Sequence, residues 1–259
     1  METIDLAGRR GPVVGVANAD SLAWCAARHF RNAGAELAMT YYNEKARSFV
    51  APLAEEVQAQ LLPCNVLQDG QLEAVFDALR ERWGKRDFVF HSIASARKED
   101  LQGRLADCSG PGFVEAMLVF CHSLIRMARL VAPLMHDGGS LTTVSYYCAE
   151  KVVEHYNVMG QVKAALEASV RNLAHELVPG GIRVNAISAG PVRKRAASGI
   201  TQFDELVDEV ARKSPQRRTV DGCEVGRVAL LLASPYAWAI TGEVVHVDAS
   251  CHVEGMVFH

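Results

Sequence analysis

Two tyrosines and a lysine in the middle of the chain could carry out acid–base chemistry on a carbonyl compound. Tyr156 and Lys163 are seven residues apart, so on a helix their side chains share one face, two turns apart. A phenol beside an ammonium group can donate a hydrogen bond to a carbonyl or enolate oxygen, while the ammonium binds hydroxyl groups and stabilises nearby negative charge. Tyr146 supplies a second phenol directly after Ser145, which ends a predicted strand. The same spacing in an arbitrary helix usually means only that the side chains pack, so further features are needed.

A turn rich in small residues follows the first predicted strand and could approach a pyrophosphate group. The turn spans residues 15–23, GVANADSLA, and leads directly into a predicted helix. Pyrophosphate groups bind at such helix N-termini, where backbone N–H groups lack intrahelical partners. Gly15 is the only glycine in the turn, so the GxGxxG pattern fails, and the motif alone predicts no more than a turn. Its position between a strand and a helix favours a dinucleotide site.

The end of the second predicted strand, near Tyr42, is where such a fold distinguishes the two nicotinamide cofactors. An acidic residue there holds the ribose hydroxyls of NAD, whereas a basic residue binds the 2′-phosphate of NADP. Glu44 favours NADH and Lys45 favours NADPH. The sequence leaves both cofactors open, with NADH preferred.

Alternating strands and helices must position these residues. Short apolar, β-branched segments alternate with longer amphipathic ones, the pattern of βαβ units that build a parallel sheet. We predict an α/β chain, with a single Rossmann-like domain over residues 1–259: a doubly wound parallel sheet of about seven strands with helices on both faces. The predicted strands are 11–16, 36–42, 60–66, 88–93, 140–145, 182–188 and 243–248. The predicted helices are 21–33, 70–83, 112–135, 157–177 and 221–233, and residues 203–213 could also be helical.

Composition and charge argue against several other classes of protein. Of the 259 residues, 49% are hydrophobic, enough for one sizeable core. The formal net charge is −3, with no basic cluster of the kind that binds nucleic acid phosphates. The longest apolar stretch, around 228–240, is interrupted by Ser234 and Pro235 and is shorter than the ~18 residues of a membrane span. The N-terminus lacks the apolar run of a signal peptide. We therefore predict a soluble, cytoplasmic protein that binds neither nucleic acid nor membrane.

The seven cysteines and nine histidines are dispersed along the chain. There is no CxxC pair and no HExxH motif, so we predict no bound metal. An odd number of cysteines at irregular spacings is typical of thiols in a reducing compartment.

Over nearly its whole length the chain resembles the bacterial NADH-dependent enoyl-acyl-carrier-protein reductases of the short-chain dehydrogenase/reductase superfamily. The similar segments, in the same order and at similar spacing, are GVANADSLAW, GAELAMTYYNEKA, HSIA, KEDL, SYYCAEKVVEHYNVMGQVKAALEASVR, GIRVNAISAGP, AASGI and ITGEVVHVD. The resemblance implies a homotetramer that transfers hydride from the nicotinamide to C3 of a trans-2-enoyl thioester held on acyl carrier protein.

The resemblance also assigns the catalytic roles. Tyr156 would hydrogen-bond the thioester carbonyl and stabilise the enolate, Tyr146 would be the second active-site phenol, and Lys163 would bind the nicotinamide ribose. Tyr147 and Lys151 have the YxxxK spacing of carbonyl-reducing members of the superfamily. In those enzymes the tyrosine lies at the start of the long helix, well beyond the serine that ends the strand, and Tyr156 occupies that place. We therefore predict that Tyr156 and Lys163 form the functional pair.

Other residues are expected, by the same resemblance, to contact the cofactor or the acyl chain. The expected cofactor contacts are Gly15, Ser21 and Leu22 on the pyrophosphate side, Tyr42 at the second strand end, Asn65 and Val66 at the adenine, Ile93 and Val192 at the nicotinamide, and Lys194 near the pyrophosphate. Ser95 and Ala96 would line the acyl site, and residues 192–206 would form a mobile substrate-binding loop.

Several residues depart from the family pattern and leave activity and substrate open. They are Cys25, Asn65, Ser95, Arg97, Lys194 and the run 249–251, Ala-Ser-Cys. Asn65 replaces an aspartate that accepts a hydrogen bond from the adenine, and an amide oxygen can still accept one. Ser95 replaces a phenylalanine, which changes the shape of the acyl pocket.

Three alternative functions therefore remain open. One is a specialised enoyl-thioester reductase with a non-standard acyl substrate. Another is a carbonyl or ketoacyl reductase, which the spacing of Tyr156 and Lys163 disfavours. The third is a non-catalytic nucleotide-binding protein that kept the fold, and the presence of the tyrosine and lysine pair counts against it.

Overall fold

The computed structural model describes residues 3–101, 103–154, 156–192 and 203–255. Within these residues one parallel sheet has the strand order β3-β2-β1-β4-β5-β6-β7. The strands are β1 (Arg10–Val14), β2 (Glu36–Tyr41), β3 (Gln60–Pro63), β4 (Phe88–His91), β5 (Gly139–Ser145), β6 (Ile182–Ala189) and β7 (Val244–Val247). From β1 the chain builds the sheet outward in one direction and then, from β4, in the other. The predicted doubly wound sheet is confirmed.

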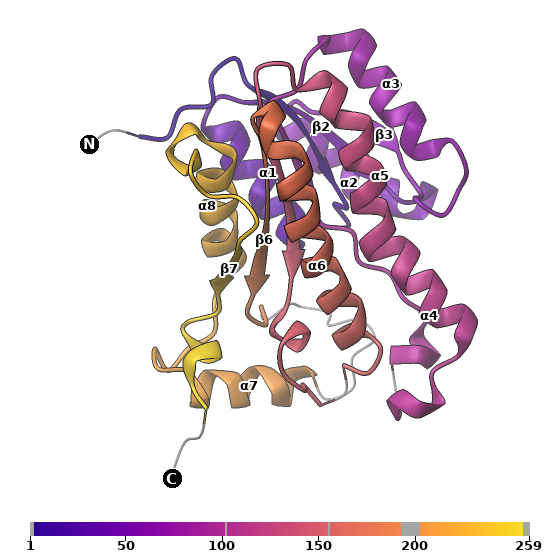
Figure 1. Ribbon diagram of the computed structural model, residues 1–259, viewed down its shortest axis with the longest axis vertical. Helices are drawn as coiled ribbons and strands as arrows, with labels where there is room; N and C mark the ends of the chain where they lie inside the picture. The colour runs from indigo at the N-terminus through magenta and orange to yellow at the C-terminus, as the bar shows by residue number, and fades with distance from the viewer. Residues whose placement is uncertain (1–2, 102, 155, 193–202, 256–259) are drawn as a thin grey trace.

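Helices cover both faces of this sheet (Figure 1). They are α1 (Leu22–Asn32), α2 (Glu44–Glu56), α3 (Gln71–Trp83), α4 (Gly110–Met117), α5 (Ser123–Val131), α6 (Met159–Leu177), α7 (Phe203–Lys213) and α8 (Gly222–Ala233). Residues of α3, α5 and α6 belong to one buried apolar cluster, and residues of α1, α2 and α8 belong to the other. The two clusters are the two sides of a three-layer α/β/α arrangement.

Successive strand residues supply the two layers alternately. Phe88 and Phe90 of β4 belong to the cluster on the α1 side, and Val89 between them belongs to the cluster on the α6 side. Because a parallel strand is buried on both faces, it reads as a continuous apolar run. This is why the strands could be located from the sequence, whereas α2 was not among the predicted helices. Pro52 lies inside α2, and the helix begins at Asn43, whose side-chain oxygen accepts a hydrogen bond from Ala46 N.

The apolar stretch at 228–240 is not the most membrane-like one, which corrects the sequence analysis. The continuous helix Gly110–Leu134, which contains a π-helical turn at Leu118–His122, is long and apolar enough to span a membrane by length and composition alone. Half of its most apolar window is buried inside the molecule. Leu124 and Met127 of this helix are fully buried in the core beneath α3 and α6. The helix therefore has the environment of a core helix in a globular protein.

All seven described strands are parallel, so their carboxyl ends meet at one edge of the sheet. The segments that follow β1, β2, β3 and β4 converge there, and Tyr146 follows β5 at the same edge. In Figure 1, α7 lies below this edge. Crevices at the carboxyl ends, where the strand order reverses, are where such folds bind ligands.

Candidate functional site

A cavity of about 400 Å³ opens at the carboxyl ends of β1, β2, β3 and β4. Six of the predicted cofactor and acyl-site residues line it: Gly15, Tyr42, Asn65, Val66, Ile93 and Ser95. Asn18, Thr40, Phe49 and Val119 also line it, and the sequence analysis did not single them out. Only the pattern of strand ends could have suggested Asn18 and Thr40, because their types carry no chemistry specific to a cofactor. The volume and the position at the switch point suit a dinucleotide.

Gly15 is required by the close approach of two strand ends. Its φ is +103°, and a Cβ atom at this position would lie 2.3 Å from the carbonyl oxygen of Ser92. Its N–H donates to Thr40 Oγ1 at 3.3 Å. Only glycine combines this backbone conformation with this contact, so the turn after β1 leaves its backbone exposed to the cavity.

Ser21 and Leu22 do not line the cavity, although they were predicted to meet the pyrophosphate. The Ser21 hydroxyl donates to Asn18 O at 2.7 Å and accepts from Trp24 N at 3.3 Å, so it forms the N-cap of α1. Ala17 and Asn18 of the same turn line the cavity instead. The contribution of Ser21 in this structure is to orient the N-terminus of α1.

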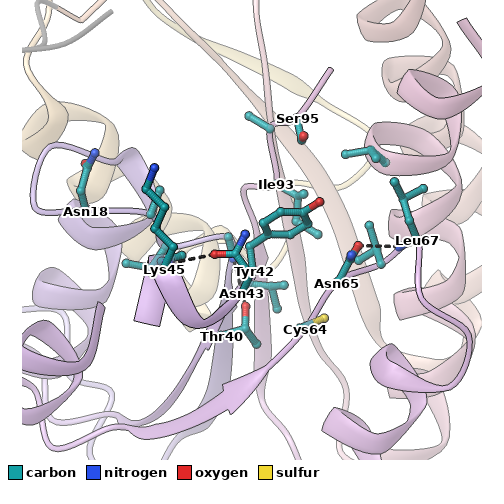
Figure 2. Close-up of a pocket in the computed structure, with 18 of the residues that line it drawn as sticks. Asn18, Thr40, Tyr42, Asn43, Lys45, Cys64, Asn65, Leu67, Ile93 and Ser95 are labelled. Carbon is teal, nitrogen blue, oxygen red and sulfur yellow. Dashed lines mark hydrogen bonds between the residues drawn. The ribbon is translucent and has the colours of Figure 1, made fainter. Parts of the chain in front are cut away.

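The region beyond β2 presents a lysine to the cavity. Lys45 lines it, whereas Glu44 does not. The Glu44 carboxylate is engaged by the Tyr41 hydroxyl at 3.3 Å and by Arg47 at 3.4 Å. Figure 2 shows Lys45 and Asn18 on one side of the cavity and Asn65 on the other, with the Tyr42 ring between them. The residue on which the expectation of NADH rested is therefore outside the cavity, and the one that favours NADPH is inside it.

Asn65 lies at the far side of this cavity with its side-chain oxygen already engaged. Its Oδ1 atom accepts from Leu67 N at 3.0 Å (Figure 2). Its own backbone N–H donates to Gln71 Oε1 at 2.8 Å. An amide oxygen has two lone pairs, so Oδ1 can accept a second hydrogen bond from an adenine amino group. The substitution of aspartate by Asn65 therefore keeps an acceptor in place.

Tyr146 and Tyr156 lie in direct contact beside the carboxyl edge of β5. Their rings stack with centroids 4.6 Å apart and an interplanar angle of 30°. Their hydroxyl groups interact through a side-chain hydrogen bond, in which either group can donate while both are protonated. Burial raises the pKa of both phenols well above the ordinary value, and the hydrogen bond with Tyr146 acts to lower that of Tyr156. Both phenols are protonated at neutral pH and can act as hydrogen-bond donors.

Tyr156 is not on the helix that carries Lys163, which corrects the argument from helical spacing. The helix α6 begins at Met159, and Tyr156 lies in the turn before it, next to Asn157 with φ of +36°. The two side chains therefore approach the site from a turn and from a helix. The thiol of Cys148 is buried, and its charge acts on the pKa of both Tyr156 and Lys163.

Lys163 is buried and faces the end of β5. Its Nζ atom donates to Val144 O at 2.7 Å and lies 4.7 Å from the centre of the Phe120 ring. Burial lowers the pKa of Lys163 to about 8, so the ammonium form still predominates at neutral pH. By contrast, the Lys151 side chain is exposed. Burial of Lys163 at the end of β5, the strand that Tyr146 follows, favours it over Lys151 as the functional lysine.

The remaining predicted residues are only partly described. Ala96 packs against the same core cluster as Tyr146 and Tyr156, and Val192 is half-buried. Lys194 and most of the predicted 192–206 loop lie outside the described residues. Among the described residues, no group of three histidine, cysteine or acidic side chains is arranged to hold a metal ion, and the absence of a metal stays a prediction.

Two of the departures from the family pattern have visible structural consequences. The Arg97 guanidinium forms an ion pair with Glu115 of α4 at 2.8 Å and so ties the segment beside the acyl site to that helix. Ala249 and Ser250 have φ of +56° and +67°. This backbone conformation favours glycine.

Comparison with known proteins gives one consistent result. The family model described as enoyl-(acyl carrier protein) reductase matches residues 15–252. The chain is 47% identical to enoyl-[acyl-carrier-protein] reductase [NADH] 1 of Rhizobium meliloti, over 96% of this chain and 92% of that protein. A crystal structure of the Anaplasma phagocytophilum reductase in complex with NAD superposes with a TM-score of 0.94 at 46% identity, covering 99% of this chain and 98% of that one. The Bacillus cereus reductase with NADP+ and an indole naphthyridinone superposes with a TM-score of 0.95 at 42% identity, covering 98% and 100%. The chain therefore belongs to the enoyl-(acyl carrier protein) reductase family.

Proposed function

We propose that this chain reduces the trans-2 double bond of an enoyl thioester carried on acyl carrier protein, with NADH as the hydride donor. The observation that carries the proposal is the stacked Tyr146 and Tyr156 pair, with the buried Lys163 nearby, at the sheet edge that also forms the dinucleotide cavity. The relatives are named as NADH-dependent reductases of this class.

The phenols suit the reaction because both remain protonated. When bound, the nicotinamide supplies the hydride for C3 of the enoyl group. Tyr156 donates a hydrogen bond to the thioester carbonyl and stabilises the enolate oxygen as charge develops there. With Tyr156 donating to the substrate, the neighbouring Tyr146 hydroxyl would donate to the Tyr156 oxygen and make it a stronger donor, because hydrogen bonds in a chain polarise one another.

The cofactor is held along the row of strand ends. Lys163 binds the hydroxyls of the nicotinamide ribose, and the backbone at Gly15 and Asn18 meets the pyrophosphate. Asn65 accepts from the adenine, and Ile93 lies on the nicotinamide side. Lys45 in the cavity supports use of NADPH as a second cofactor. The nicotinamide and acyl contacts of Val192, Lys194, Ser95 and Ala96 are part of the same proposal.

The assembly and location follow from the same assignment. We propose one catalytic domain over residues 1–259 with a substrate-binding loop at about 192–206, assembled as a homotetramer in the cytoplasm. Val114, Leu118 and Ile125 support an interface between copies, since these apolar side chains are 55%, 40% and 41% exposed on one helix. None of the seven cysteines forms a disulfide, which suits a reducing compartment.

The decisive experiment follows oxidation of NADH and NADPH by absorbance with trans-2-enoyl thioesters of several chain lengths, and with a 3-ketoacyl thioester for comparison. We expect oxidation that depends on the enoyl thioester. Activity with the ketoacyl thioester alone would assign the chain to carbonyl reduction. Absence of cofactor binding at millimolar NADH and NADPH would leave a non-catalytic protein.

A further inference from the structure

Two successive turns of α6 hold two successive residues at the end of β5. Lys163 donates to Val144 O at 2.7 Å. Glu167, four residues further on the same helix face, accepts a hydrogen bond from the Ser145 hydroxyl at 2.5 Å. The Ser145 and Glu167 side chains are only 2% and 6% exposed. The end of this strand is therefore fixed by side-chain contacts in addition to the sheet.

We call these two contacts, from Lys163 to Val144 and from Ser145 to Glu167, the clamp. The next residue along the chain is Tyr146. It follows Ser145 directly, and its ring stacks on Tyr156. We propose that Glu167 is a positioning residue: through Ser145 it fixes the end of β5 and so orients Tyr146, and through its charge it supports the Lys163 cation. The inference rests on the proposed function, because it concerns the same tyrosine and lysine groups.

The charge of Glu167 also acts on Lys163. Burial lowers the pKa of Lys163, and the nearby acidic groups Cys148, Cys121 and Glu167 oppose that effect. Burial also raises the pKa of the two thiols, to about 12 for Cys148 and about 11 for Cys121. Both thiols are therefore neutral near pH 8, where Lys163 titrates. Glu167 is the group among the three that can carry a negative charge there.

Other charged groups face Glu167 from three elements. Burial raises its pKa, the Ser145 hydrogen bond lowers it, Glu150 raises it, and His246 of β7 and Arg171 of α6 lower it. His246 Nε2 lies 3.2 Å from Glu150 Oε1, within ion-pair distance but without hydrogen-bond geometry. The carboxylate is thus surrounded by charges of both signs, and the hydrogen bond to Ser145 favours its ionised form.

The clamp matters most when the cofactor is bound. Lys163 has three donor hydrogens, and in the proposed role it must share them between Val144 O and the ribose hydroxyls. The contact from Ser145 to Glu167 does not change its partner in this process. The hydrogen bond between Ser145 and Glu167 then holds α6 to the end of β5 without being shared with the cofactor.

The test uses three variants and two readouts that separate charge from hydrogen bonding. Glu167→Gln keeps the shape and an acceptor oxygen but removes the charge. Ser145→Ala keeps the charge but removes the hydrogen bond, and Glu176→Gln at the exposed end of α6 is the matched control. The readouts are the pH at which NADH affinity falls, from fluorescence titration, and kcat with an enoyl thioester.

We expect NADH affinity of the unaltered protein to be lost as the pH rises through the pKa of Lys163. In Glu167→Gln this midpoint moves to lower pH by about half a unit or more, a roughly threefold change in the proton affinity of Lys163. In Ser145→Ala the midpoint stays in place while kcat falls about tenfold, because a misplaced tyrosine loses part of its transition-state contact. Glu176→Gln changes neither.

An unchanged midpoint in Glu167→Gln, or an unaltered kcat in Ser145→Ala, overturns the proposal. If Glu167→Gln fails to fold, as shown by thermal unfolding, Ser145→Ala decides alone. The midpoint is measured by binding, so it remains informative even if the unaltered protein reduces no enoyl thioester. Absence of enoyl reduction by the unaltered protein would contradict the proposed function. The pH midpoint would still test whether the charge of Glu167 acts on Lys163.

Discussion

Burial keeps the phenols of Tyr146 and Tyr156 protonated at neutral pH. Tyr156→Phe removes the hydroxyl that we propose meets the thioester carbonyl but keeps the stack on Tyr146. We expect kcat to fall about 100-fold, within the usual range for loss of a positioned acid, while NADH affinity stays nearly unchanged. Steady-state kinetics and fluorescence titration measure the two effects, with Tyr236→Phe on the exposed surface as control. Equal losses of kcat and cofactor affinity would contradict the assignment.

At the residue scale we also expect the Lys45 side chain to influence cofactor preference. Lys45 lines the cavity at the N-terminus of α2, where both its charge and the helix dipole favour an anion. We expect Lys45→Glu to weaken NADPH binding about tenfold or more, the scale of one charge-assisted hydrogen bond, and to change NADH binding little.

Titration of both cofactors at two salt concentrations checks the role of Lys45. The loss for NADPH should shrink at high salt, because the interaction is between exposed charges. Lys151→Glu, on an exposed turn outside the cavity, is the matched charge reversal. Equal losses for NADH and NADPH in Lys45→Glu would show that Lys45 does not distinguish them.

At the scale of elements, α1 and α8 pack so closely that two glycines of α8 are constrained. A Cβ atom on Gly222 would lie 2.4 Å from Cys25 Sγ, and one on Gly226 would lie 2.9 Å from the backbone oxygen of Cys25. We expect Gly222→Ala to destabilise the protein by about 1–3 kcal/mol, the usual cost of overpacking. Cys25→Ala should restore part of that loss, since it removes the sulfur atom.

Gly226→Ala provides the matched comparison for this double-mutant cycle. Its clash is mainly with the Cys25 backbone and the His29 ring, so Cys25→Ala should not rescue it. Denaturant unfolding of the single and double variants measures the coupling. Equal rescue of both alanine variants, or of neither, would contradict this account of the contact.

The elements that the sequence predicted best are those with a strong periodic signal. All seven predicted strands were located, because buried parallel strands are apolar on both faces, and so were the helices that pack on them except α2. The helix α2 was missed because Pro52 interrupts its pattern. The start of α6 was placed at residue 157, two residues too early, because residues 157 and 158 lie in a turn before Met159. Periodicity carries no information about such irregular turns.

The sequence predicted those site residues that follow directly after a strand and whose type suits the expected contact, as Gly15 does. The site was not predictable where tertiary contacts decide the role. The engagement of Glu44 by Arg47 and Tyr41 removes that carboxylate from the cavity, and no spacing rule shows this. The tie between Ser145 and Glu167 likewise joins a strand to a helix 22 residues later, and only the packing of α6 on β5 brings them together.

At the scale of the whole molecule, the apolar side chains left exposed along the helix Gly110–Leu134 form the proposed interface between copies. Charges introduced at such a face are costly to bury, so Leu118→Glu combined with Ile125→Glu should reduce the proposed assembly of four chains of 28.2 kDa to smaller species. Val152→Glu is the matched control, because Val152 is 98% exposed and lies outside this helix. Sedimentation velocity measures the mass of each species. A single-chain mass for the unaltered protein, or an unchanged assembly in the double variant, would show that this face is not what joins the copies.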